Sequence, residues 1–406
     1  MRWGELAQDR LAEIATCSLP GPGVTRFPFT PEHRAALEVM RGWMSRAGLS
    51  SHLDAAGTLV GRQDGQGACV LLGSHQDSVR HAGRYDGIMG VALACLALEK
   101  LRADGMSLAY PVEVLAFADE EGVRFPTALL GPRALAETAD PGVLTMADEE
   151  GEVLGAALDA FGGDQRAVPA LARDPADIRC YLELHIEQGP VLETLDRPVG
   201  VVTGICGIER NTVLFRGETG HAGTVPMLGR ADALVAAADF ISAVHDQARQ
   251  TADLRATIGT CRVGPGVANG IPDRVELTLE LRAPEDVARA AFAARMQAEA
   301  ERCAIRRGVR SAMTRSYEQP AVPCAPDLVA RLSEAVAATT GREATRLASG
   351  ATHDASAMAD LCDIGMLFVR CRGGVSHRPE EFASAEDMGA AIDVLARTLL
   401  AFDHWA

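Results

Sequence analysis

The feature that most restricts the fold is a central block in which the order of predicted strands and helices differs from that in the chain before and after it. Residues 212–318 predict a strand, a helix, two strands, a helix and a strand. This βαββαβ order is the split unit of a ferredoxin-like sandwich. Apolar and polar residues alternate strictly at 274–283, which predicts one packed and one wet face for its sheet. The six elements are expected at residues 212–216, 230–248, 256–263, 274–283, 285–307 and 311–317.

The chain outside this block predicts an α/β domain with a largely buried sheet. Before the block, short apolar runs alternate with helical stretches, and this pattern returns after residue 326. A chain of 406 residues is longer than one compact core usually holds. We therefore predict one domain from residues 1–207 and 324–406, with residues 208–323 inserted as a second domain. The expected elements of the first are strands at 69–73, 112–118, 180–186 and 366–370 and helices at 87–101, 328–340 and 385–402.

Charge and hydropathy exclude several classes of partner. The chain has 39 basic and 55 acidic residues, a formal net charge of -16, which disfavours binding to nucleic acid or an anionic membrane. Its apolar stretches fall short of the roughly 20 residues that span a bilayer. Residues 1–15 predict a charged amphipathic helix rather than a signal peptide. We expect a cytoplasmic protein whose ten cysteines, which include no CxxC pair, are reduced.

Histidines and carboxylates gather at the ends of the predicted strands. Ligands of open α/β sheets bind beyond the carboxyl ends of the strands, where these side chains would converge. In chain order they are His75 and Asp77 after the first strand, Asp86 before the helix at 87–101, Asp119, Glu120 and Glu121 after the second strand, His185 in the third and His377 after the fourth.

Each of these pieces also has an ordinary structural interpretation. A His-x-Asp pair in a loop is more often a surface hydrogen-bonding pair than a ligand, and an acidic run is usually a solvated turn. His185 could be a hydrogen-bonded core histidine. Gly220-His221-Ala222-Gly223 could be only a turn, and Arg282 could be a residue on the wet face of its strand. The joint occurrence of these pieces in one chain is what favours a functional site.

Eight motifs in a fixed order carry a resemblance to a known family. They are GSHQDSV, GRYDGIMGV, DEEGVRFP, LHIEQGPVLE, GHAGTVPM, NGIPDRVELTLELR, SGATHDA and GVSHRPEE. From about residue 25 to its C-terminus the chain resembles the amidohydrolase branch of the M20 metallopeptidase superfamily. That branch contains N-carbamoyl-L-amino acid hydrolases, allantoate amidohydrolases and β-ureidopropionases. LHIEQGP separates it from the peptidases, which generally carry a carboxylate where His185 stands.

The resemblance implies a metallopeptidase-like catalytic domain with two divalent metal ions per subunit. Asp86 would bridge the two ions, with Glu121 and His377 completing one site and His75 and His185 the other. A mixed histidine and carboxylate site accepts zinc or manganese, and also cobalt or nickel.

Two more acidic residues have implied roles beside the metals. Glu120 would be the general acid and base that takes a proton from water and delivers it to the leaving nitrogen. Asp77 would hydrogen-bond His75 and fix its tautomer. A urea or amide carbonyl is a poor electrophile, so hydrolysis at neutral pH needs the activation of carbonyl and water that two metals supply.

The resemblance further implies a small anionic ureido substrate and a homodimer. His221 would donate to the developing oxyanion, and in the family it reaches the metal centre of the neighbouring subunit. Arg282 has the planar fork that suits a carboxylate. The inserted domain would act as lid and dimerisation domain. The implied substrate contacts are Gln188, His221, Asn269, Arg282, Gly350 and Ala351.

Three departures from the family pattern leave the reaction class intact and the exact substrate open. Glu280-Leu281-Arg282 stands where the family often has Asp-x-Arg, and Thr352 stands where it often has Gly. Arg372 lies in a segment that usually carries a small polar residue, and it could either add a second contact to an anion or only reach solvent.

We expect a metal-dependent amidohydrolase that cleaves the ureido C–N bond of an N-carbamoyl-L-amino acid or a related ureido acid. Three alternatives stay open. They are an allantoate amidohydrolase, an M20-type dipeptidase or aminoacylase, which LHIEQGP disfavours, and a non-catalytic dimer that binds a metal or metabolite. The presence of Glu120 beside five candidate ligands argues against the last, because a binding module does not need an unligated base.

Overall fold

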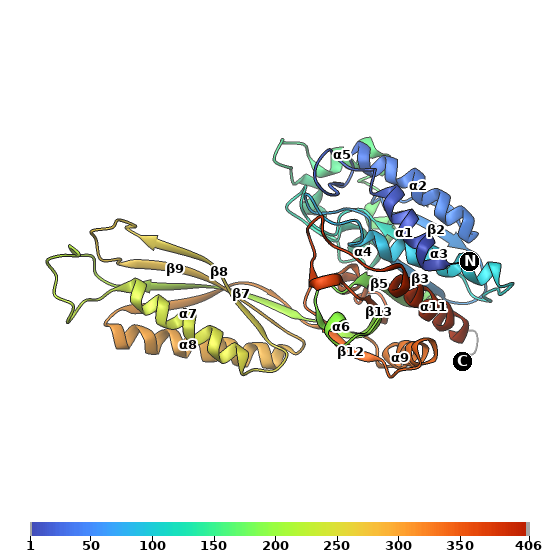
Figure 1. The fold of residues 1–406 in the computed structure, drawn as a ribbon. Coiled ribbons are helices and arrows are strands. Elements are labelled where there is room, and N and C mark those ends of the chain that lie inside the picture. The colour runs from blue at the N-terminus through green and yellow to red at the C-terminus, as the bar shows by residue number, and fades with distance from the viewer. Residues whose placement is uncertain (1, 403–406) are drawn as a thin grey trace. The chain divides into compact units, whose positions relative to one another are not determined.

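The computed structural model describes residues 2–402 and divides the chain into two compact units (Figure 1). Unit 1 contains residues up to 203, 324–347 and the chain from 352 onward, and unit 2 contains residues 204–323 with 348–351. Unit 2 thus begins at residue 204 rather than at 208 and also takes in the short segment 348–351. Residues 1 and 403–406, which the sequence prediction included in the first domain, lie outside the described residues.

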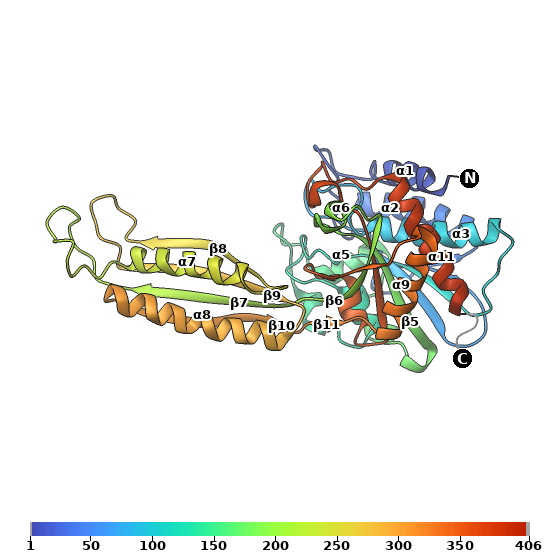
Figure 2. The ribbon, with the colours of Figure 1, turned by 60° about the horizontal axis from the view of Figure 1, so that its bottom comes forward.

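Unit 1 is built on a mixed β-sheet with helices packed against it (Figure 2). Strands β4, β3, β5 and β13 run parallel to one another, and β2 and β6 flank them in antiparallel pairing. The sheet order is β1-β2-β4-β3-β5-β13-β6-β11, and β12 also pairs with β6. The strands of this sheet are β1 Ser50–Leu53, β2 Leu59–Gln63, β3 Cys69–His75, β4 Val112–Phe117, β5 Ile178–Ile186, β6 Val199–Ile205, β11 Val322–Pro323, β12 Thr345–Ser349 and β13 Ile364–Val369. Of these, β11 and the last two residues of β6 and of β12 belong to unit 2.

The central strands are buried on both faces, as the sequence predicted. Every residue of β3, β4 and β13 is buried, and this includes Ser74 and His75 at the polar end of β3. Among residues 2–402, the structure contains no helix with the length and apolar character that crossing a membrane requires. The helices of unit 1 are α1 Trp3–Ile14, α2 Pro31–Ala47, α3 Ile88–Ala103, α4 Leu130–Leu135, α5 Leu154–Phe161, α6 Val191–Thr194, α9 Pro326–Thr340, α10 Asp354–Met358 and α11 Ala385–Phe402.

Helix α2 was not predicted, although its ends carry clear local signals. The Thr30 side chain caps the first turn by accepting from the backbone N–H of His33, and Pro31 occupies the first helical position. Gly48 ends the helix in the left-handed conformation, with φ of 84°. The helix packs against α3 and β1 through its buried face.

Unit 2 has the predicted order of elements. Its four strands form an antiparallel sheet in the order β10-β7-β9-β8. The alternation in β9 is as predicted, since Val275, Leu277, Leu279 and Leu281 are fully buried and belong to one core with residues of α7 and α8. The elements are β7 Gly207–Arg216, α7 Ala233–Arg249, β8 Arg255–Gly264, β9 Arg274–Ala283, α8 Asp286–Arg307 and β10 Arg310–Gln319.

Candidate metal centre

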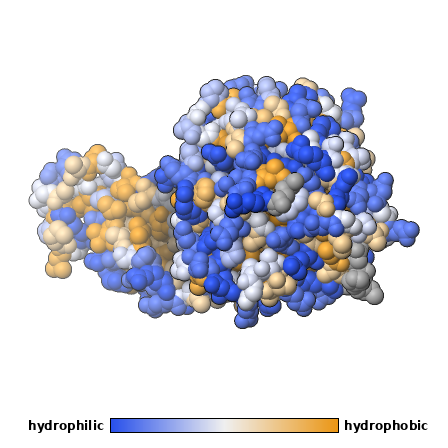
Figure 3. All heavy atoms as spheres, turned by 45° about the vertical axis from the view of Figure 1, so that its right-hand side comes forward, coloured by the Kyte–Doolittle hydropathy of each residue, from blue (hydrophilic) through white to orange (hydrophobic). Residues whose placement is uncertain are grey.

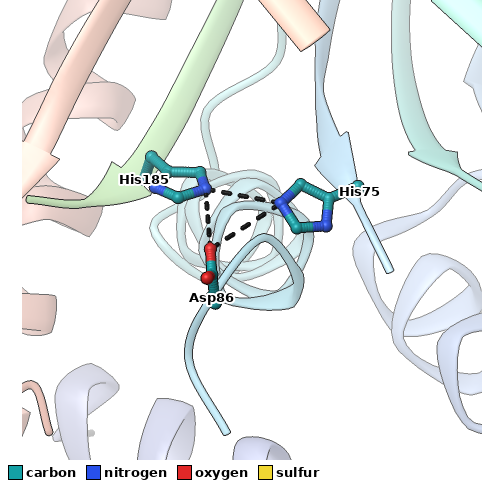
Figure 4. Close-up of side chains that lie close together, drawn as sticks. All are labelled: His75, Asp86 and His185. Carbon is teal, nitrogen blue, oxygen red and sulfur yellow. Dashed lines mark hydrogen bonds and ion pairs between the residues drawn. The ribbon is translucent and has the colours of Figure 1, made fainter. Parts of the chain in front are cut away.

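Two imidazoles and a carboxylate meet at the carboxyl ends of β3 and β5 (Figure 4). His75 is the last residue of β3, and His185 lies one residue before the end of the neighbouring parallel strand β5. Their Nε2 atoms are 3.5 Å apart. Asp86 Oδ1 lies 3.1 Å from Nε2 of His185 and 3.7 Å from Nε2 of His75. All three side chains are buried.

The other carboxylate oxygen of Asp86 faces a second group. Oδ2 lies 3.3 Å from Nε2 of His377, which in turn lies 3.9 Å from Oε2 of Glu121. Asp86, Glu121 and His377 each offer a ligand atom within 4.8 Å of the others. The structure therefore brings all five predicted metal ligands together, with Asp86 between two groups of donors.

The donor geometry fits metal ions. Ligand atoms arranged tetrahedrally at about 2.1 Å from an ion lie about 3.4 Å apart, close to the spacing in the first group. Nδ1 of His75 lies 3.0 Å from the backbone oxygen of Asp77, and Nδ1 of His185 lies 2.9 Å from that of Ile186. Because a carbonyl oxygen only accepts, both Nδ1 atoms carry the proton. The Nε2 lone pairs are then free to bind an ion.

Glycine at position 87 is required by this packing. Gly87 separates Asp86 from helix α3 and has φ of 63°. A Cβ atom there would lie 2.4 Å from the His75 ring. The Asp-Gly pair of the GRYDGIMGV motif thus lets the Asp86 loop pass directly beside the imidazole.

Asp77 hydrogen-bonds His75 as the resemblance implied, but through its backbone oxygen. Its carboxylate oxygen is 3.6 Å from Nδ1 of His75, whereas its backbone oxygen is the hydrogen-bond acceptor at 3.0 Å. The carboxylate instead accepts from the backbone N–H groups of Glu120 and Glu121, at 3.2 and 3.1 Å. Asp77 therefore orients the chain that carries both acidic residues, because the sharp turn after β4 leaves their N–H groups without backbone partners.

Glu120 lies at the edge of the first group. Its Oε2 is 3.9 Å from Nε2 of His75. His75, Glu120 and Glu121 each offer a possible ligand atom within 4.8 Å of the others. Burial, together with the charges of Glu121, Asp354 and Asp77, raises the pKa of Glu120 well above its usual range, although His75 opposes this. A carboxyl group with a raised pKa can hold a proton near neutral pH, as a general acid and base must.

Neighbouring carboxylates raise the pKa values of His75 and His377. Burial would lower the pKa of His75, but Asp77, Glu120 and Asp86 raise it well above its usual value. The hydrogen bond to Asp86 raises the pKa of His377 to about 9. The carboxylates thus attract positive charge to this place, and metal binding would replace those protons with ions.

The predicted substrate contact Gln188 lies against Asp86, a predicted metal ligand. Its Nε2 donates to Oδ2 of Asp86 at 2.9 Å and to Oγ of Ser376 at 3.1 Å. The backbone of Gln188 is in the left-handed region, with φ of 56°. The side-chain amide of Gln188 therefore helps to fix the position of the Asp86 carboxylate.

Two buried residues behind His185 were missed by sequence reasoning. The His353 ring packs edge-on against that of His185, with centroids 4.4 Å apart, and burial lowers its pKa well below the usual value. Glu183 accepts from Oγ of Ser74 at 2.8 Å and from the backbone N–H of Ala355 at 2.9 Å. The available signals were the histidine of SGATHDA and the alternation that puts Glu183 on the same face of β5 as His185.

The predicted substrate contacts of unit 2 fall into two groups. His221 and Asn269 lie close together beyond the end of the sheet where β7 stops and β9 begins, since the N–H of Ala222 donates to the oxygen of Asn269. Arg282 lies near the other end of β9, where Nη1 donates to the oxygen of Gly350 at 2.6 Å. Arg274 and Arg282 are eight positions apart along the strand, a span of roughly 26 Å.

Arg282 is held by its neighbour two positions earlier. Its Nε and Nη2 lie 2.9 and 2.8 Å from Oε1 of Glu280. The Ala351 N–H donates to Oγ of Ser349 at 3.1 Å, which shapes the loop that offers Gly350. Arg372, for which two interpretations were open, stacks its guanidinium over the ring of Phe382 at 4.2 Å.

Replacing His185 by alanine should lower the amount of bound metal, because it removes one of the two imidazoles of the first group. Metal analysis of the dialysed protein after reconstitution measures this. His52→Ala is the matched control, since His52 is exposed on β1 of the same unit and should leave the metal content unchanged. An unchanged metal ratio in His185→Ala would remove His185 from the site.

Comparisons with known proteins relate the whole chain to one family. The model described as Peptidase family M20/M25/M40 matches residues 71–401. The chain is 39% identical over 400 residues to an N-carbamoyl-L-amino acid amidohydrolase of Geobacillus stearothermophilus, with 98% of each chain covered. It is 38% identical over 418 residues to an allantoate deiminase of Arabidopsis thaliana, covering 95% of this chain and 80% of that one.

A solved structure of an amidase also matches nearly the whole chain. A hydantoinase/carbamoylase family amidase from Burkholderia multivorans matches with a TM-score of 0.91 at 32% sequence identity, covering 98% of this chain and 97% of that chain. The fold, the motifs and the gathered histidines and carboxylates agree with these matches, and the chain belongs to peptidase family M20/M25/M40.

Proposed function

We propose that this protein is a metal-dependent amidohydrolase that cleaves the ureido C–N bond of an N-carbamoyl-L-amino acid. The observation that carries this proposal is the convergence of three histidines and two carboxylates on one place, with Glu120 beside them. The names of several relatives support the substrate class, among them an N-carbamoyl-L-amino-acid amidohydrolase of Paenarthrobacter aurescens at 38% identity over 98% of each chain.

We propose that His75, Asp86, Glu121, His185 and His377 would hold two divalent ions. Three imidazole nitrogens and carboxylate oxygens are a donor set that zinc or manganese accepts, and that cobalt or nickel also accepts. When bound, the ions would supply Lewis acidity to a carbonyl oxygen and to water.

Glu120 would move the protons of the reaction. Its carboxylate would take a proton from the attacking water and deliver it to the nitrogen that leaves as the C–N bond breaks. The carbamic acid formed by this cleavage would then decompose, so that the final products are the amino acid, ammonia and carbon dioxide. The raised pKa of Glu120 supports this role, because the side chain must hold the proton between the two transfers.

Arg282 and His221 would recognise the substrate. The Arg282 guanidinium, oriented by Glu280, would bind the substrate carboxylate. His221, an exposed residue in a loop of unit 2, would donate to the developing oxyanion. Gly350 and Ala351 would line the same pocket as Arg282, since the Gly350 oxygen already contacts that side chain.

We propose that unit 2 is a ferredoxin-like lid and dimerisation domain. His221 and Arg282 of one chain are separated by about the length of β9, so they cannot contact the same small substrate. A homodimer resolves this, because His221 could then serve the neighbouring subunit. Strand β8 is an edge of the sheet, and the adjoining helix α7 exposes Leu234 and Val235. Apolar residues also form patches on the face of unit 2 seen in Figure 3.

Allantoate is the second candidate substrate, and four allantoate deiminases among the relatives, at 35% to 38% identity, favour it. A dipeptidase has less support. The aminopeptidase PepT from Bacillus cereus shares the fold at a TM-score of 0.64, but only 18% of the sequence. Glu120 argues against a non-catalytic protein that only binds a metal or metabolite, because such a protein does not need an unligated base.

A substrate panel tests the proposed activity. After reconstitution with each metal, N-carbamoyl-L-amino acids should be hydrolysed with release of ammonia, and dipeptides and N-acyl amino acids should react far more slowly. Colorimetric detection of ammonia measures hydrolysis of the N-carbamoyl-L-amino acids. Amino acid analysis measures hydrolysis of the dipeptides and N-acyl amino acids. Faster turnover of allantoate would assign the second candidate, and hydrolysis of dipeptides alone would refute the ureido assignment.

Glu120→Gln should reduce turnover by about 10²- to 10⁴-fold, because the amide cannot accept the proton from water. Bound metal should stay unchanged, as measured by metal analysis of the same sample. Glu149→Gln, at an exposed loop position, should retain full activity. If Glu120→Gln remained fully active, another group would have to be the base.

Mixing two inactive variants tests the shared site. Co-refolding equal amounts of Glu120→Gln and His221→Ala subunits should restore about one quarter of the wild-type activity, because half of the dimers would hold one complete site. Steady-state kinetics of the mixture and of each parent measure this. A mixture as inactive as both parents would place His221 and Glu120 of the same subunit in one site, whereas a fully active His221→Ala parent would remove His221 from the site.

A further inference from the structure

Glu381 has a buried carboxylate that links two loops of the candidate metal centre. Only 3% of the residue is exposed, and it lies in the loop between β13 and α11. Its Oε1 accepts from the backbone N–H groups of Tyr85 and Asp86, at 3.1 and 3.0 Å. Its Oε2 accepts from Oγ of Ser376 at 3.0 Å. One side chain thus binds the residues at or next to two proposed ligands, Asp86 and His377.

Two other contacts join the same loops, since Asp86 Oδ2 lies 3.3 Å from Nε2 of His377 and 3.5 Å from Oγ of Ser376. Asp86 and Glu381 are 295 residues apart in the sequence, and each loop follows its own strand of the sheet. The backbone N–H of Asp86 lies one residue before Gly87, the N-cap of helix α3, and it donates to the Glu381 carboxylate. The carboxylate of Glu381 satisfies that donor and so sets where the Asp86 side chain begins.

The loop that carries His377 needs support. His377 has φ of 57°, a left-handed conformation that costs a residue other than glycine about 1 kcal/mol or more. Ser376, directly before it, donates to Glu381 and accepts from Gln188. Since Gln188 also donates to Asp86, the chain of hydrogen bonds from Glu381 closes on the proposed bridging ligand.

The chain leaves room for this carboxylate at Gly83. A Cβ atom at position 83 would lie 2.4 Å from Cβ of Glu381 and 2.5 Å from its Oε1. Contacts this short do not occur between real side chains, so any larger residue would displace Glu381.

We infer that Glu381 is a positioning residue, which holds Asp86 and His377 at the separation needed to bind a metal ion between them. This inference rests on the proposed metal centre and adds to it a residue that contacts no ion. Such partners of ligands typically contribute about 10- to 100-fold to metal affinity.

Metal retention tests the inference. In Glu381→Ala, the concentration of chelator that removes half of the metal should fall about 10- to 100-fold. Glu381→Gln should retain metal almost as well as the wild type, because its amide oxygen can still accept from both N–H groups. The matched control is Glu380→Ala, since Glu380 is the same residue type one position earlier and its side chain is 62% exposed. It should behave as the wild type.

Hydrogen exchange gives a readout that does not depend on turnover. Peptides that contain Tyr85 and Asp86 should exchange faster in Glu381→Ala than in the wild type, and Glu380→Ala should not change them. Gly83→Ala, which displaces the side chain without removing the carboxylate, should reproduce both effects, and it serves if Glu381→Ala does not fold. Circular dichroism identifies folded variants.

Three results would overturn the inference: unchanged metal retention in folded Glu381→Ala, equal losses in Glu381→Gln and Glu381→Ala, or an equal loss in Glu380→Ala. These failures are distinct from failure of the metal centre itself. If His185→Ala loses metal while Glu381→Ala does not, the centre stands and only the role of Glu381 is wrong.

Discussion

The interaction on which the site depends is the contact of one buried carboxylate with three imidazoles. Asp86 presents Oδ1 to His185 and His75 and Oδ2 to His377, and these histidines come from three separate parts of the chain. A buried carboxylate without partners is costly, because it loses its hydration in a low-dielectric interior. The contacts offset that cost, and they hold the strand ends and loops of unit 1 together at this place.

The surroundings of Asp86 are rich in further buried acids. Burial raises the pKa of Asp119 and Asp354 well above the usual range, and neighbouring carboxylates add to the effect. Burial, followed by the charge of Asp86, raises the pKa of Glu121 to about 7. So much negative charge in one interior region requires protons or cations nearby. Divalent ions would satisfy this requirement, which gives a physical reason for the proposed metals that is independent of ligand spacing.

The sequence predicted much of the fold because the relevant signals are local. Strict alternation identified β9, and long apolar runs identified β3, β4 and β13 within a few residues. The missed helix α2 had its signals in Thr30, Pro31 and Gly48, so it could have been found. The segment 348–351 could not have been assigned to unit 2 from sequence, because its membership follows from contacts such as that between Gly350 and Arg282.

The sequence by itself determined which residue types were available, since the eight motifs contain the proposed ligands and the proposed base and carry the resemblance that implies the reaction class. Only the tertiary structure decided what each neighbouring side chain does. Asp77 binds the backbone of Glu120 and Glu121, Gln188 binds Asp86, and Glu381 joins two loops, none of which follows from spacing along the chain. The reason is that a hydrogen bond depends on the position and direction of two atoms, and for residues far apart in sequence these are set only when the sheet and its loops have packed.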